Sequence, residues 1–113
     1  MSTRSWKDRI EDILDALAEI QSFASNVDFE DFLHDKKTLK AIALDFIVIG
    51  EAASNIPDDV VANHPEIAWH LMRGMRNRLV HAYYSIDEKI VWDTVQNDLP
   101  PLMEPLKQIL EEK

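Results

Sequence analysis

The segment MRNRLVHAYY, residues 75–84, combines the side chains best suited to chemistry on a phosphodiester. Arginine presents a planar set of donors that fits a phosphate and stays charged, whereas histidine titrates near neutral pH and can transfer a proton. RNA cleavage without a metal needs a base for a 2'-hydroxyl, a cation for the charge growing on phosphorus and an acid for the leaving 5'-oxygen. Arg76 and His81 offer these functions, with Tyr83 as a further candidate.

This segment lies in the one basic stretch of an acidic chain. The 113 residues carry 12 Lys and Arg against 21 Asp and Glu, a formal net charge of -9. No Asp or Glu occurs from residue 67 to 86, where Arg73, Arg76 and Arg78 are found. An acidic chain does not coat DNA or an anionic membrane through its overall field, so any anion site must be local. The alternative is that these arginines pair with carboxylates of neighbouring helices.

One straight helix cannot point all the candidate groups at one place. At about 100° per residue Arg76 and Tyr83 nearly eclipse, whereas His81 lies roughly 140° around from Arg76. Asn77 and His81, four residues apart, form a second stripe. The helix could loosen near His81, Arg76 could reach around it, or two copies related by a twofold axis could share a groove. The last alternative predicts a homodimer.

The elements that must position this segment are predicted to be helical. Glycine occurs only twice, and Ala, Leu, Ile, Glu and Lys dominate, which favours helices over hairpins. The first helix is expected over about residues 5–25 with Ser5 as its cap, and the second over residues 36–56, up to Pro57. Apolar stripes at helical spacing predict the core residues Trp6, Ile10, Ile13, Leu14, Leu17, Ile20, Leu39, Ile42, Phe46, Ile49 and Ala53.

Prolines and capping residues mark the second half of the chain. Residues 57–64 are expected to form at most a short helical turn. Pro65 then favours a third helix that runs from about residue 66 through the motif segment. Asp87 can cap a fourth helix carrying Ile90, Val91, Trp92 and Val95, and Pro100 and Pro101 should kink or restart it.

Together these elements predict an all-α protein. We expect an antiparallel four-helix bundle with short extra helical turns, forming a single domain over residues 1–113 and pairing as a homodimer. Without cysteine or an uncharged run of 18 residues, the chain suits the reducing cytoplasm and is not expected to cross a membrane. No metal and no cofactor are predicted. The spacing of His34, His64 and His70 from nearby acidic residues does not match a metal site. The aromatic residues expected in core or dimer packing are Trp6, Trp69 and Trp92.

Arg76, followed after four residues by His81 and then by Tyr83, resembles the signature of the HEPN superfamily, specifically its HepT-like toxins. The resemblance extends to DFIVIGEAASNIP, IAWHLMRGMRNRLVHAYYSID and IVWDTVQNDLPPLMEPLKQIL, and so to nearly the whole chain. It implies a metal-independent RNase of a two-gene, type VII-like toxin–antitoxin system that favours tRNA. It also implies a partner, a minimal nucleotidyltransferase that neutralises the toxin by adenylylating the motif tyrosine.

Carried over to this chain, the resemblance implies that Arg76 stabilises the scissile phosphate and that His81 is the general acid or base. Asn77 would orient His81 or RNA, and Tyr83 would be the modified residue, although Tyr84 adds a second hydroxyl beside it. Arg73 and Arg78 are supporting candidates. The alternative function is a non-catalytic helical subunit that presents substrate to the nucleotidyltransferase or restrains it.

Glu51 is a further supporting candidate on the second predicted helix. It follows Gly50 in an apolar stretch, so it is expected either as a buried, paired acid or as a residue that orients an arginine of the site. Because an unpaired buried charge is costly, we expect Glu51 to pair with an arginine of the third helix.

Overall fold

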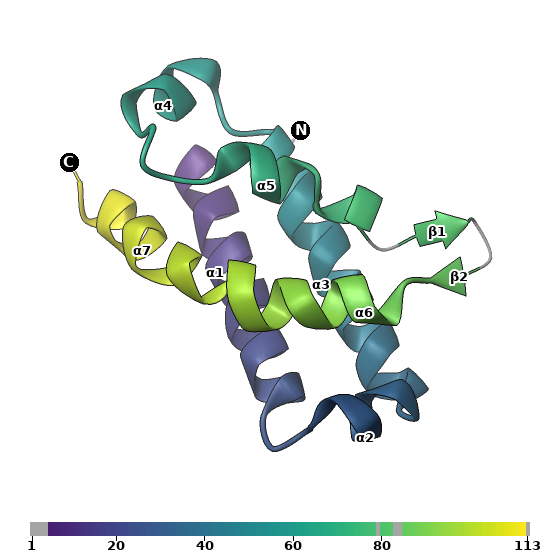
Figure 1. The fold of residues 1–113 in the computed structure, drawn as a ribbon. Coiled ribbons are helices and arrows are strands. Elements are labelled where there is room, and N and C mark those ends of the chain that lie inside the picture. Colours follow the sequence, from purple (N-terminus) through teal and green to yellow (C-terminus); the bar gives the residue numbers. More distant parts are fainter. Residues whose placement is uncertain (1–4, 79, 83–84, 113) are drawn as a thin grey trace.

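The computed structural model describes residues 5–78, 80–82 and 85–112, with the backbone alone for residues 80–82 and 85. Figure 1 shows two long helices side by side, with shorter elements wrapped around them. The first half of the chain forms α1 (Trp6–Ala24), α2 (Phe29–Leu33), α3 (Lys36–Ser54) and α4 (Asp58–Asn63). The predicted first and second helices are therefore confirmed, with ends that differ by one or two residues.

Side-chain caps explain where the two long helices begin. The hydroxyl of Ser5 accepts the Asp8 amide at 3.3 Å, and the Ser5 amide donates to the Asp8 carboxylate at 2.9 Å, so both donors at the start of α1 are satisfied. At the start of α3, Asp35 accepts from both the hydroxyl and the amide of Thr38. Both hydrogen bonds lower the pKa of Asp35, and the bond from the Thr38 hydroxyl has the larger effect.

The core is centred on the contact between α1 and α3. Fully buried side chains come from the predicted stripes of both helices, for example Ile13 of α1 and Phe46 of α3. Trp6, Leu14 and Leu39 are only partly buried and pack against its edge. Trp69 is buried, and Trp92 packs against Phe32, with ring centroids 5.1 Å apart. The stripe predictions and the packing role of the tryptophans are confirmed.

The third predicted helix is wrong as a continuous element. The chain instead forms α5 (Trp69–Arg73), the 3-10 turn η1 (Met75–Arg78) and a small antiparallel hairpin of β1 (Val80–Ala82) and β2 (Ser85–Ile86). The helical backbone therefore ends before His81, as one of the alternatives predicted. Gly74 ends α5, and the β-branched and aromatic residue types Val80, Tyr83 and Tyr84 favour extended backbone over helix.

The last quarter of the chain is a helix interrupted by its prolines, as predicted. Asp87 caps α6 (Glu88–Asp93) by accepting the Ile90 amide at 3.1 Å. The backbone then widens into a π-type turn, η2 (Thr94–Asp98), and tightens into the 3-10 turn η3 (Pro100–Leu102) before α7 (Met103–Glu111). Pro100 and Pro101 lack amide hydrogens, so the regular pattern of hydrogen bonds cannot pass through them.

The all-α class is confirmed, with the short hairpin as its one extended feature in the described part of the chain. None of the described helices has the length and apolar character needed to cross a membrane.

Candidate functional site

The three clustered arginines have different environments, and Arg73 serves the backbone. Its Nε donates to the carbonyl of Ala53 at 3.2 Å, and its Nη2 donates to the carbonyl of Ile56 at 3.4 Å. Ala53 belongs to the last turn of α3, where helix carbonyls have no partner within the helix, and Ile56 follows two residues after the end of α3. Arg73 therefore joins α5 to the end of α3 and to the residues that follow it.

Arg78 fastens the other side of η1. Its Nη1 lies 2.6 Å from the carboxylate of Asp98 and 3.1 Å from the hydroxyl of Thr94. Thr94 is buried and donates its own hydroxyl hydrogen to the carbonyl of Ile90. The guanidinium thus ties η1 to the widened turn between α6 and α7, as the pairing alternative predicts.

Arg76 lies between these two anchors and faces solvent. Its side chain is 61% exposed, and its one ion pair within the described chain joins Nη1 to Oε2 of Glu51 at 3.7 Å. The predicted pairing of Glu51 with an arginine of this segment is confirmed, whereas the alternative of a buried Glu51 is wrong, since its side chain is 65% exposed. At this distance and exposure the pair is weak, so a phosphate can compete for the guanidinium.

Gly50 sets the distance between α3 and residues 73–78, which we call the arginine segment. A methyl group placed there would lie 3.4 Å from Cγ of Arg76 and 3.5 Å from the carbonyl oxygen of Met72. The backbone of η1 therefore packs directly onto α3. This close packing brings Arg76 and Glu51 together from two separate elements.

The other predicted site residues are placed only in part. Asn77 is exposed on η1, and its amide donates to the carbonyl of Gly74 at 3.0 Å. The backbone of His81 belongs to β1, so it is separated from Arg76 by the end of η1 and no longer shares a helix with it. The side chain of His81 and all of Tyr83 lie outside the described residues. The structure therefore brings together Arg76 and Glu51, with Asn77 following Arg76 on the same exposed turn.

One polar residue in the core escaped the sequence prediction. Asp45 is 6% exposed in the contact of α3 with α1, and its Oδ2 has no hydrogen-bond partner among the described residues. The pKa of Asp45 is raised to about 7. Burial is the largest cause, and the hydrogen bond with Glu19 and the negative charge of Glu19 act in the same direction. A single acid inside the apolar run AIALDFIVIG was the available signal.

A second unexpected cluster involves His64, which was predicted as a lone histidine. Its Nδ1 lies 3.3 Å from Oε2 of Glu66, and its Nε2 lies 3.1 Å from Oε2 of Glu112. The ring thereby links the α4–α5 connection to the end of the chain beyond α7. The described residues contain no group of three or more His, Cys, Asp or Glu side chains that could hold a metal ion.

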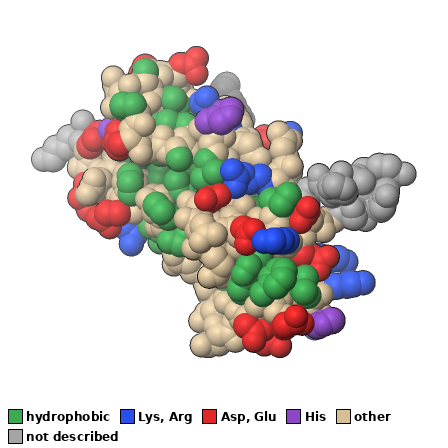
Figure 2. Space-filling view, in the orientation of Figure 1, with side chains coloured by type: hydrophobic (Ala, Val, Ile, Leu, Met, Phe, Trp, Pro, Cys, Tyr) green, Lys and Arg blue, Asp and Glu red, His purple; other side chains and the backbone are tan. Residues whose placement is uncertain are grey.

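Charge on the molecular surface is mixed. In the face shown in Figure 2, Lys and Arg side chains lie next to Asp and Glu side chains and form no continuous basic surface. A nucleic acid that bound on this face would therefore be held by local contacts rather than by a broad basic field.

Comparison with known proteins decides the family. A family profile described as "Ribonuclease HepT-like" matches residues 13–109. The chain belongs to the HepT-like ribonuclease family. A Thermococcus cleftensis protein named as a probable ribonuclease HepT is 48% identical over 88% of this chain and 90% of its own length.

Two further relatives come from Methanocaldococcus jannaschii, and both are named as putative RNases. One is 37% identical over 89% of this chain and 84% of its own length. The other is 31% identical over 99% of this chain and 93% of its own length. No solved structure matches the chain significantly.

Proposed function

We propose that this HepT-like chain is a metal-independent endoribonuclease, the toxin of a type VII-like toxin–antitoxin system that acts on cellular RNA in the cytoplasm. The observation that carries the proposal is the exposed guanidinium of Arg76, held between two arginines that each bond to oxygens of another element. The names of the relatives support the same activity. tRNA is the favoured substrate, on the resemblance to the toxin family.

In the proposed reaction the adjacent 2'-hydroxyl of RNA attacks phosphorus. The 2'-oxygen forms a bond to phosphorus while the bond from phosphorus to the 5'-oxygen breaks, which leaves a 2',3'-cyclic phosphate and a 5'-hydroxyl. His81 takes the proton of the 2'-hydroxyl or supplies the proton of the leaving oxygen. Arg76 donates to the nonbridging oxygens as negative charge grows on them.

The neighbouring residues have positioning roles in this proposal. Arg73 and Arg78 hold the two ends of the arginine segment, so that Arg76 is presented from a fixed turn. Glu51 orients the Arg76 guanidinium until a phosphate replaces it. Asn77 orients His81 or the RNA.

A minimal nucleotidyltransferase is proposed as the partner that neutralises the toxin by adding AMP to Tyr83. The phosphate of the added group would compete with RNA for the donors of Arg76, and its adenosine would block the site. The proposal also includes a homodimer. Each protomer would be a HEPN-like antiparallel four-helix bundle, with α5 and η1 in place of the third helix and α6 through α7 as the fourth.

The test is cleavage of total RNA by purified protein in the presence of EDTA, with the ends of the products identified. Arg76→Ala and His81→Ala should each lose activity while they remain folded. His34→Ala, just after α2, and Lys107→Ala, on α7, are matched controls at exposed positions and should cleave as the wild type does. Cleavage at the wild-type rate by both site variants would contradict the proposed site.

A further inference from the structure

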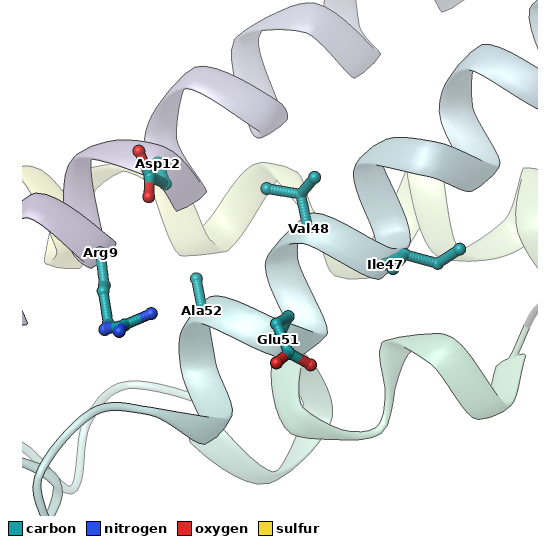
Figure 3. A pocket seen from close by; sticks show the side chains of 6 residues that line it. All are labelled: Arg9, Asp12, Ile47, Val48, Glu51 and Ala52. Atoms are coloured by element: carbon teal, nitrogen blue, oxygen red, sulfur yellow. The ribbon is translucent and has the colours of Figure 1, made fainter. Parts of the chain in front are cut away.

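A small cavity opens beside the arginine segment, between the first half of α1 and the second half of α3 (Figure 3). Its volume is about 240 Å³. The side chains that line it are those of Arg9 and Asp12 from α1 and of Ile47, Val48, Glu51 and Ala52 from α3. Sites for drug-sized ligands have volumes of about 300–1,000 Å³, so this cavity can hold one flat ring system while the rest of the ligand stays outside.

Arg9 gives the cavity a cation that no other described residue neutralises. Its side chain forms no ion pair within the described part of the chain, whereas Arg78 is paired with Asp98. Figure 3 shows the side chain of Arg9 extending from α1 toward the wall that α3 forms. The guanidinium of Arg9 is therefore placed to donate to a group bound in the cavity.

Glu51 connects this cavity to the proposed RNase site. Its carboxylate lines the cavity and also lies 3.7 Å from Nη1 of Arg76. The preceding residue, Gly50, packs against the side chain of Arg76. The guanidinium of Arg76 and the cavity thus lie on adjacent sides of one turn of α3. Because only a sugar separates a base from its phosphate, an RNA whose phosphate binds Arg76 has a base within reach of the cavity.

The walls of the cavity suit a nucleobase better than a second phosphate. Three aliphatic side chains of α3 offer apolar contact to the face of a ring, and a guanidinium plane is a common stacking partner for RNA bases. At the edges of the cavity, the carboxylates of Asp12 and Glu51 outnumber the one guanidinium of Arg9. This balance of charge disfavours an anion and favours a neutral ring with both donors and acceptors on its edges.

We propose that this cavity is a base-binding subsite for RNA and that it prefers guanine; the proposal rests on the proposed RNase function. Guanine matches both walls. Its O6 and N7 accept from the guanidinium of Arg9, as they commonly do from arginine in nucleic-acid complexes. Its N1–H and exocyclic amino group donate side by side to the carboxylate of Glu51. Adenine, cytosine and uracil have no such pair of neighbouring donors, so each leaves part of the subsite without a partner.

Binding of the phosphate and binding of the base then support each other through Glu51. While the phosphate site is empty, the Glu51 carboxylate stands against Arg76. A phosphate that takes the guanidinium of Arg76 releases this carboxylate, whose side chain is 65% exposed and free to turn toward the cavity. The donor edge of guanine replaces the lost cation as its partner. Glu51 is thus a positioning residue for Arg76 before RNA binds and a base-binding residue afterwards.

Isothermal titration calorimetry with nucleoside 3'-monophosphates tests the subsite without any cleavage, because these compounds have no phosphodiester bond. Guanosine 3'-monophosphate should bind the wild type at least about 10-fold more tightly than inorganic phosphate does. It should also bind at least about 5-fold more tightly than the adenosine, cytidine and uridine compounds.

Arg9→Lys is the sharpest variant, because it keeps the charge and removes the planar set of donors that guanine accepts from. It should lose the preference for guanosine and keep the wild-type affinity for inorganic phosphate. Arg76→Ala should instead weaken the binding of all four nucleotides and of inorganic phosphate. Lys37→Ala is the control, since it removes an exposed cation at the other end of α3 and should keep the full preference. Circular dichroism establishes that each variant is folded.

Equal binding of the four nucleotides by the wild type, or no binding at millimolar concentration, overturns the proposal. A preference for another base, or an undiminished preference for guanosine in Arg9→Lys, does the same. Sequencing of the RNA ends gives a second reading: guanosine should be enriched on one side of the cuts made by the wild type, and Arg9→Lys should lose this enrichment. A protein that selects guanosine as expected but leaves RNA intact would contradict the proposed function alone, whereas cleavage without any base preference would contradict the subsite alone.

Discussion

Two neighbouring regions of the molecule differ in where their charged groups lie. One is the core contact between α1 and α3, and the other is the arginine segment, which packs onto α3. In the first, the carboxyl of Asp45 is buried with one oxygen unpartnered, and its pKa rises to about 7. In the second, Arg73 and Arg78 each bond to oxygens of another element, and Arg76 remains in solvent. The buried carboxyl in the core therefore costs stability, whereas the arginines of the segment fix a turn and leave the guanidinium of Arg76 exposed to solvent.

The largest predicted effect is the loss of RNA cleavage in Arg76→Ala, and it should distinguish Arg76 from Arg73 and Arg78. Arg76→Ala should lower the rate of RNA cleavage by about 10²–10³, the usual cost of removing one donor that stabilises growing negative charge. Its melting temperature should hardly change, because exposed side chains contribute little to stability. Initial rates and thermal melts measure the two quantities. A loss of activity that is matched by a large drop in melting temperature would assign Arg76 to the fold instead.

In the core, Asp45→Asn should change how stability depends on pH. The pKa of Asp45 is raised from 3.8 to about 7, so the folded protein keeps a proton that the unfolded chain has lost. The contribution of the protonated Asp45 carboxyl to the free energy of unfolding is therefore complete below about pH 4 and is lost as the pH rises through about 7. Asp45→Asn removes this loss and should be more stable than the wild type at about pH 8 by on the order of 2 kcal/mol.

Urea denaturation at several pH values measures this difference between Asp45→Asn and the wild type. Asp98→Asn is a useful comparison, because that carboxylate is partly exposed and already paired with Arg78. A difference between the wild type and Asp45→Asn that stays constant with pH would show that the Asp45 carboxyl does not titrate in this range.

Unlike Arg76→Ala, Arg78→Ala should lower the free energy of unfolding, and this effect should be smaller than the preceding ones. It leaves Asp98 and the buried Thr94 hydroxyl without their shared donor, and a bond to a charged group contributes about 1.5–3 kcal/mol. Because the Arg78 side chain is 35% exposed, solvent screening reduces the expected loss to about 1 kcal/mol. Urea denaturation measures it. If Arg78→Ala and Arg76→Ala are equally stable, Arg78 does not stabilise the fold more than Arg76 does.

The two regions also differ in how far the sequence predicted them. Helices α1 and α3 have regular apolar stripes and capping residues, so spacing alone located both helices and most of their buried side chains. Asp45 was missed because periodicity reports which face is buried and not which buried atom lacks a partner. The exposed Glu51 follows from the same geometry, since Gly50 occupies the contact with η1 and the next residue turns outward.

In the arginine segment the sequence did not predict the shape of the backbone. Continuing helical spacing through His81 gave a long third helix, whereas the chain ends α5 at Gly74 and enters a 3-10 turn and a hairpin. That choice depends on tertiary contacts, such as the bond from Arg78 to Asp98, which join residues 20 positions apart in the chain. Local propensity cannot supply contacts of this kind.

The smallest predicted effect is that of Gly50→Ala, at the position where the two regions are in contact. A methyl group there meets its neighbours at 3.4–3.6 Å, which is ordinary contact, and alanine is a better helix former than glycine. Gly50→Ala should therefore raise the free energy of unfolding by up to about 1 kcal/mol. Gly50→Val has no room for its second methyl group without moving η1, and should lower it by about 1–3 kcal/mol. Urea denaturation of the pair decides the matter: if valine is tolerated as well as alanine, η1 does not rest on α3 at this point, and the position of Arg76 is set by Arg73 and Arg78 alone.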